Sequence, residues 1–229
     1  MDFELCMKTL ENMGNLAMRK IYLNGGALEP LYGVKMGDLR NFAKEIGIDH
    51  ALALSLYASN NHDAMMLSGM ICDPKQLTRE TLDHWADTSR CIMIAERSVA
   101  PLAAGRTDAW EIADAWIKST EEMTACAGFT IYGMLFAFIP DQDLNLDKVK
   151  KIIDEIEARI KIERPYLQNA MNNCLIMAGM YIVPMTAYCK EVADRIGYVK
   201  PTIKVNNCNI QSASDYIIRY APRKKMKSI

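Results

Sequence analysis

Apolar residues recur along most of the chain at the three- and four-residue spacing of amphipathic helices. In "MGDLRNFAKEIG" (residues 36–47), the apolar positions share one helix face, and the closing glycine is a helix stop signal. An earlier stretch of the same kind predicts a first helix over residues 3–22. The glycine- and proline-containing segment "LNGGALEPLYG" separates the two helices.

From about residue 49 the chain repeats a two-helix theme four times. Each repeat has an amphipathic helix, a short turn and a more apolar helix, and the first helices begin near residues 49, 75, 107 and 146. A spacing of roughly 25–40 residues is typical of helical repeats such as HEAT, whose helix pairs bury their apolar faces only by stacking. We therefore predict an all-α fold, an α–α superhelix of HEAT-like antiparallel helix pairs. A non-repetitive all-α domain is the alternative.

The second helices of the pairs contain small residues, which would allow neighbouring helices to approach closely. They are Ala64, Ser68 and Gly69, then Ala125, Ala127, Gly128 and Gly133, and finally Ala178 and Gly179.

We predict a single domain over residues 1–229. It comprises N-terminal helices to about residue 47, stacked helix pairs over 48–197, a C-terminal extended segment and helix over 198–220, and a basic tail over 221–229. β-Branched and turn-forming residues in "YVKPTIKVNNCNIQSAS" favour an extended segment or short hairpin. A last helix should then run from about Ala213 to Tyr220.

Composition narrows the class of protein. The 27 basic and 28 acidic residues give a net charge of −1, which argues against a strongly basic coat for non-specific nucleic-acid binding but leaves room for a local basic groove. No run approaches the roughly 20 apolar residues of a membrane span, and the N-terminus lacks the features of a signal peptide. We expect a cytoplasmic protein that does not contact membranes.

The residue patterns give no support for a metal or a cofactor. None of the seven cysteines forms a CxxC pair, their odd number suits a reducing compartment, and the three histidines are dispersed. The glycines of "NGGAL" are not followed by the Lys-Ser/Thr pair of a phosphate-binding loop. We expect neither a metal nor a nucleotide cofactor.

One apolar stretch, "SRCIMIAERSVAP" (residues 89–101), has three charged residues inside a predicted helix. On a regular helix, Arg90, Met93 and Arg97 fall on one face at positions i, i+3 and i+7. Two arginines one above the other could contact neighbouring DNA phosphates, which fixes a protein on DNA without reading its sequence. The alternative is that both arginines are ordinary solvent-facing residues.

Several segments, in order, resemble the DNA alkylation-repair proteins of AlkD type. The resemblance covers roughly residues 14–220, and no single motif in it is as specific as a metal cluster. The matching positions are Gly33, Val34, Leu39 and Arg40 in a Gly-Val-x-x-x-x-Leu-Arg pattern, the acidic Asp63, Ala193, Ile196, Gly197 and Val199 in an Ala-x-x-Ile-Gly-x-Val pattern, and the downstream Cys208.

The resemblance implies a superhelix with a concave basic groove that takes duplex DNA. Active members of the family are glycosylases that remove N3- or N7-alkylated purines without a metal or cofactor. Their chemistry breaks a C–N glycosidic bond through an oxocarbenium-like sugar, which a positioned carboxylate can stabilise.

The active-site pattern of the family departs from this sequence. That pattern is Trp-Asp-x-x-Asp on one helix and an arginine on the next repeat. Aligned through "AP" (residues 100–101), its tryptophan falls on Met93 and its catalytic aspartate on Arg97. Shifted by one residue, the two positions fall on Ile92 and Glu96. The family arginine, on the next repeat, falls on Cys126. Glu96 is therefore the candidate catalytic carboxylate.

The candidate DNA-binding residues are Arg90, Arg97 and Tyr132. Tyr132 lies in a second helix and could line the groove, and a buried tyrosine with a hydrogen-bonded hydroxyl is the alternative. The sequence thus predicts a DNA alkylation-repair-like protein that binds duplex DNA, and its departures leave open whether it is a glycosylase. Two alternatives are a catalytically inactive relative that binds nucleic acid and a helical-repeat module that binds another protein.

Overall fold

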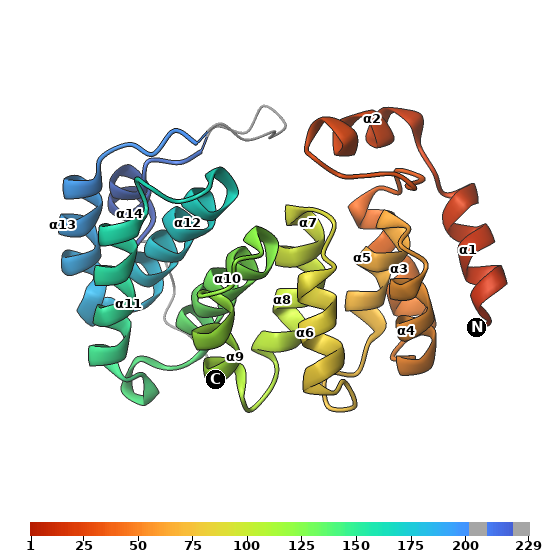
Figure 1. Cartoon of the computed structure of the whole chain (residues 1–229), viewed down its shortest axis with the longest axis horizontal. Helices are drawn as coiled ribbons and strands as arrows, with labels where there is room; N and C mark the ends of the chain where they lie inside the picture. Colours follow the sequence, from red (N-terminus) through yellow and green to blue (C-terminus); the bar gives the residue numbers. More distant parts are fainter. Residues whose placement is uncertain (202–209, 222–229) are drawn as a thin grey trace. The chain divides into compact units, whose positions relative to one another are not determined.

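The computed structural model describes residues 1–201 and 210–221, which form helices joined by turns and loops (Figure 1). Within these ranges no β-strand occurs, so the expected all-α fold is confirmed. The predicted hairpin region and Cys208 fall mostly on residues 202–209, and the basic tail falls on 222–229. Both segments lie outside the described residues.

The chain divides into two compact units, and each is described by itself. Unit 1 comprises residues 1–109, and unit 2 comprises the described residues from 110 onward. The single domain predicted for residues 1–229 stays a prediction.

Unit 1 contains the first two helix pairs after an N-terminal group of helices. Its elements are α1 (Phe3–Asn12), α2 (Leu16–Asn24), α3 (Met36–Ile46), α4 (His50–Ala58), α5 (His62–Ile71), α6 (Arg79–Asp87), α7 (Ile92–Ile94), the π-helical turn η1 (Ala95–Val99) and α8 (Ala100–Ala104).

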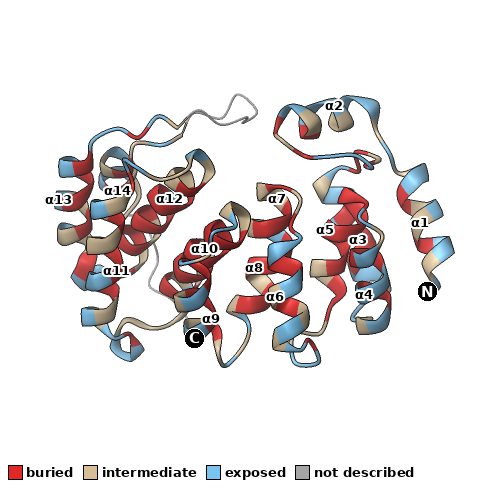
Figure 2. Ribbon diagram, viewed as in Figure 1, coloured by how far each residue is buried: buried red, intermediate tan, exposed pale blue. Residues whose placement is uncertain are grey.

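Unit 2 continues the same alternation. Its elements are α9 (Ala109–Trp116), which begins at the boundary, α10 (Glu122–Phe138), η2 (Asp141–Asp143), α11 (Leu146–Arg159), α12 (Pro165–Tyr181), η3 (Val183–Met185), α13 (Thr186–Ile196) and α14 (Ala213–Tyr220). In both units the buried side chains lie mainly on helix faces that meet neighbouring helices (Figure 2).

The single first helix predicted over residues 3–22 is wrong, because the chain breaks between α1 and α2. Asn15 caps the second helix, and its side-chain oxygen accepts the backbone N–H of Met18 at 2.9 Å. A Cβ at Gly14 would lie 2.9 Å from the carbonyl oxygen of Glu11 and 3.0 Å from that of Tyr32. The chain crosses the α2–α3 loop at this point, and the close approach requires glycine.

The predicted close packing of small residues is confirmed at three glycines. A Cβ at Gly69 would lie 2.6 Å from the Cα of Ser98, and one at Gly128 would lie 2.8 Å from the backbone nitrogen of Ile117. A Cβ at Gly179 would lie 2.6 Å from a side-chain carbon of Ile217. In the first two cases the obstacle is the backbone of the neighbouring segment, so helices there pack at a distance that only glycine allows.

Candidate nucleic-acid interface

The stretch "SRCIMIAERSVAP" is not one regular helix. Cys91 is the N-cap residue of α7, so Arg90 lies before the helix begins. The prediction that Arg90, Met93 and Arg97 share one helix face is therefore wrong. The helix also widens into the π turn η1, which carries both Glu96 and Arg97.

Pro101 gives a physical reason for the π turn. In an α-helix its backbone nitrogen would donate to the carbonyl of Arg97, but proline has no N–H and its ring crowds that carbonyl. The N–H of Ala100 instead donates to the carbonyl of Ala95, five residues back. Single π turns of this kind occur frequently at functional sites.

The Arg90 guanidinium binds backbone rather than pointing freely into solvent. It donates to the carbonyl of Asn60 at 2.6 Å and to that of Glu29 at 2.5 Å. These carbonyls belong to the α4–α5 turn and to the α2–α3 loop. Arg90 thus connects three segments of unit 1, a structural role that the sequence did not predict.

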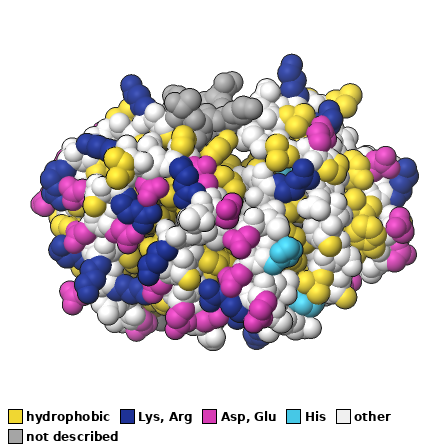
Figure 3. Space-filling model, viewed as in Figure 1, with side chains coloured by type: hydrophobic (Ala, Val, Ile, Leu, Met, Phe, Trp, Pro, Cys, Tyr) yellow, Lys and Arg dark blue, Asp and Glu magenta, His cyan; other side chains and the backbone are white. Residues whose placement is uncertain are grey.

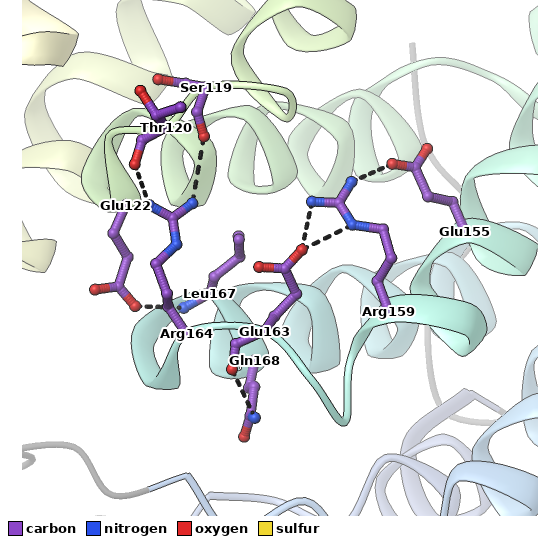
Figure 4. Close-up of polar contacts among 9 residues, drawn as sticks. All are labelled: Ser119, Thr120, Glu122, Glu155, Arg159, Glu163, Arg164, Leu167 and Gln168. Atoms are coloured by element: carbon purple, nitrogen blue, oxygen red, sulfur yellow. Dashed lines mark hydrogen bonds and ion pairs between the residues drawn. The ribbon is translucent and has the colours of Figure 1, made fainter.

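Unit 2 has a similar arginine-to-backbone contact just before α12. Arg164 donates to the backbone carbonyls of Thr120 and Ser119, in the turn before α10 (Figure 4). A second connection runs in the opposite direction, because the carboxylate of Glu122 in α10 accepts two backbone N–H groups at the start of α12. Arg164 and Arg90 therefore both anchor the beginning of a second helix to the preceding repeat.

Arg97 differs from these two arginines. Its side chain is exposed and forms no hydrogen bond or ion pair with the described residues. A free guanidinium of this kind can donate two parallel hydrogen bonds to a phosphate. Arg97 is the candidate DNA contact that best fits the geometry.

Glu96, the candidate catalytic carboxylate, is half-buried in η1. Its carboxylate accepts no hydrogen bond from the described part of the chain. Burial raises the pKa of Glu96 from 4.5 to about 7, and the neighbouring Arg97 charge opposes this rise. The group therefore carries only part of its negative charge near neutral pH.

Asp63 is a structural anchor. It is buried, and its carboxylate accepts the backbone N–H groups of Tyr32 at 2.6 Å, Gly33 at 3.1 Å and Val34 at 2.8 Å. These bonds fix the loop that leads into α3. The acidic residue that carried part of the family resemblance thus shapes the backbone.

His62, beside Asp63, is also buried, and its Nε2 atom has no hydrogen-bond partner in the structure. Its Nδ1 atom lies 3.7 Å from the sulfur of Cys91. Burial lowers the pKa of His62 and raises the pKa of the Cys91 thiol. Both groups are therefore neutral, and the pair has no activated thiolate.

Tyr132 lies in the core of unit 2. Its side chain is 1% exposed, its ring stacks on Phe136, and its hydroxyl donates to Asp114, which Lys148 also binds at 2.7 Å. The expectation that this tyrosine lines a DNA-binding surface does not fit its burial. Cys126, on the same helix, is fully buried.

Helix α3 carries two further exposed cations, Arg40 and Lys44, which were not among the predicted DNA contacts. Neither forms a hydrogen bond or ion pair with the described residues. They border a hollow of about 350 Å³ on the surface of unit 1. Their spacing of four residues, with no acidic residue three or four positions away, is a signal that the sequence does contain.

Cations on the outer helices of unit 2, in contrast, are mostly neutralised. On the face drawn in Figure 3, basic and acidic side chains are interspersed over this unit. The pairs include Lys150 with Asp154 at 2.8 Å, Lys190 with Asp194 at 2.6 Å, and Arg195 with Glu157 at 2.6 Å. Such paired surface charges offer less to a DNA backbone than free ones.

Comparison with known families agrees with the fold and the motifs. Residues 6–182 match the family described as DNA alkylation repair enzyme. The chain belongs to this family. Its predicted all-α, HEAT-like architecture is confirmed by the structural comparison that follows.

A solved structure is similar to this chain over nearly all of both molecules. The TM-score is 0.91 at 30% sequence identity, with 100% of this chain and 99% of the other covered. That structure is described as a new family of proteins related to the HEAT-like repeat DNA glycosylases with affinity for branched DNA structures.

Two uncharacterised proteins from Listeria are also similar. The Listeria monocytogenes protein is 27% identical over 230 residues, which covers 98% of this chain and 97% of the relative. The Listeria innocua protein is 27% identical over 222 residues, which covers 95% and 94%.

Two further features bear on the kind of site. Among residues 1–201 and 210–221, no three His, Cys, Asp or Glu side chains gather as a group that could hold a metal ion. No helix within the same ranges is long and apolar enough to cross a membrane.

Proposed function

We propose that this protein binds branched DNA through the surface of unit 1 that carries Arg97, and that it does not excise alkylated purines. The observation that carries the proposal is the exposed, unpaired guanidinium of Arg97 on the π turn. Membership of the DNA alkylation repair family supports DNA as the ligand. The affinity of the structural relative for branched DNA supports this form of DNA.

The contact is electrostatic and does not depend on DNA sequence. A guanidinium on a phosphate positions the protein on the duplex arms without reading bases. The net charge of −1 is no obstacle, because attraction to DNA depends on the local arrangement of charge.

The site offers little support for glycosidic-bond cleavage. A carboxyl group with a pKa of about 7 stabilises a sugar cation poorly at neutral pH, and the adjacent Arg97 charge would repel it. Ile92 and Met93 occupy the aromatic position in the two alignments and have no π-face for a cation. Cys126, at the family arginine position, is buried.

A binding experiment tests the proposal. Affinity is measured by fluorescence anisotropy for a labelled four-way junction and for a linear duplex of the same sequence, at several salt concentrations. We expect the wild type to prefer the junction. Arg97→Ala should weaken binding severalfold and reduce the slope of log K against log salt by about one unit.

Lys75→Ala is the matched control, because Lys75 is exposed on the α5–α6 loop of the same unit. It should leave affinity and salt slope unchanged. Equal binding of the junction and the duplex by the wild type, or an unchanged salt slope in Arg97→Ala, would contradict the proposal.

A further inference from the structure

The exposed face of α3 presents two cations one helical turn apart. Arg40 and Lys44 are separated by four residues, or about 6 Å along the helix axis. Both side chains are exposed, and neither has a hydrogen-bond or ion-pair partner among the described residues. The acidic residues of the same helix, Asp38 and Glu45, stand at positions that do not pair with them along the helix.

These cations border an apolar hollow of about 350 Å³ between α3 and α5. The hollow is lined by Arg40, Ala43, Lys44, Gly47, Ile48 and Met70. Ile48 is 67% exposed, so its side chain is accessible to an apolar group of a ligand. Gly47 has open space where a side chain would be, so it leaves the hollow accessible.

Two neighbouring residues of α5 link this hollow to the turn that carries Arg97. Within α5 only Gly69 and Met70 are not fully buried. Met70 lines the hollow, while Gly69 packs against Ser98, the residue after Arg97. Because α5 packs against both α3 and η1, the unpaired cations lie on the two elements that neighbour these partly buried residues of α5.

We infer that this hollow is a DNA-contact site that receives an unpaired nucleotide at a branch point, an inference that rests on the proposed function. Arg40 and Lys44 bind the phosphates on either side of the nucleotide. Its sugar or base lies against Ile48 and Met70, residue types that other DNA-binding proteins place against unstacked bases.

Charge and size select this occupant. The two cations complement a phosphate backbone, and the volume lies at the lower end of the range for small-ligand pockets, which suits a single nucleotide. A closed duplex keeps its bases stacked and offers the hollow only phosphates. A branch point with unpaired nucleotides can place a phosphate against the two cations of the hollow and a base or sugar against its apolar side chains.

The test uses the full chain and three DNA ligands of matched sequence: a junction with unpaired nucleotides at the branch, a fully paired junction and a linear duplex. Arg40→Ala/Lys44→Ala should weaken binding of the unpaired junction at least tenfold and reduce its salt slope by up to about two units. Ile48→Asn should remove the preference for the unpaired over the fully paired junction and leave the salt slope unchanged.

Lys75→Ala again controls for loss of an exposed charge. Circular dichroism should show all variants folded, since the altered side chains are exposed. The inference is overturned if Arg97→Ala weakens binding while the α3 double variant and Ile48→Asn bind all three ligands as the wild type does. It is also overturned if size-exclusion chromatography shows that the wild type forms dimers, and Ile48→Asn disrupts these dimers while its DNA binding stays intact. If the wild type binds no DNA, the proposed function itself fails.

Discussion

The Arg90 guanidinium donates a hydrogen bond of 2.6 Å to the backbone carbonyl of Asn60, thirty residues earlier in the chain. A second bond, to the carbonyl of Glu29, reaches sixty-one residues back. A stretch chosen from the sequence as a DNA contact therefore contains two arginines of different kinds. Arg90 holds unit 1 together, and Arg97 stays free.

This difference predicts opposite effects of two alanine substitutions. Arg90→Ala removes two hydrogen bonds that connect separate segments, and because water can reach the two exposed carbonyls the free energy of unfolding should fall by about 0.5–1.5 kcal/mol. Arg97→Ala should change it by less than about 0.5 kcal/mol, because an exposed side chain without partners is removed. Urea denaturation of both variants measures the difference. Equal stability of the two variants would contradict the structural role of Arg90.

Gly69 gives a second test of the packing in unit 1. Gly69→Ala would place a methyl group 2.6 Å from the Cα of Ser98 and 2.8 Å from its carbonyl oxygen, so α5 and η1 must move apart. We expect the free energy of unfolding to fall by about 1–3 kcal/mol, which is measured as a lower Tm. Gly37→Ala is the control, since Gly37 on α3 has nothing within 4 Å of its Cβ position and should be neutral or slightly stabilising. A Tm for Gly69→Ala equal to that of the wild type would show that this contact is not tight.

Local sequence signals predicted much of the fold. The last helix begins and ends at the predicted residues, Ala213 and Tyr220. The stop signal at Gly47 is confirmed, and this glycine has the positive φ angle that follows helix ends. These features depend on nearby residues, so periodicity and capping rules can detect them.

The candidate site was less predictable because it depends on distant contacts. Nothing in the sequence around Arg90 indicates that its partners are backbone carbonyls of other segments. For Tyr132 the sequence left both a groove-lining and a buried position open, and tertiary packing buries it. The π turn could have been suspected from Pro101, because a proline inside a helical pattern disturbs the preceding turn.

Glu96 makes stability depend on pH. Its pKa is about 7 in the folded protein and 4.5 as an ordinary carboxyl, so the folded state holds the proton more tightly. Its contribution to stability is complete below pH 4.5 and is lost as the pH rises toward 7 and above. Glu96→Gln cannot ionise and should be more stable than the wild type at pH 8, by at most about 3 kcal/mol, with little difference near pH 4.5. Urea denaturation at both pH values measures this, with exposed Glu80→Gln as the control. A difference between wild type and Glu96→Gln that does not change with pH would contradict the burial of this group.

The last prediction concerns base excision. We expect no release of N7-methylguanine or N3-methyladenine from duplex DNA above the spontaneous rate, scored as free base after incubation with purified protein. Cleavage requires a charged carboxylate close to the developing sugar cation. Glu96 carries only part of its charge at neutral pH, and Arg97 stands beside it in the same turn. Loss of one preorganised electrostatic group typically costs on the order of a hundred- to a thousandfold in rate. The assay is run at pH 8.5 as well as at pH 7, because Glu96 is ionised at the higher pH and could then stabilise the sugar cation. Release that appears at pH 8.5 and disappears in Glu96→Gln would identify Glu96 as a catalytic residue and overturn the non-catalytic assignment.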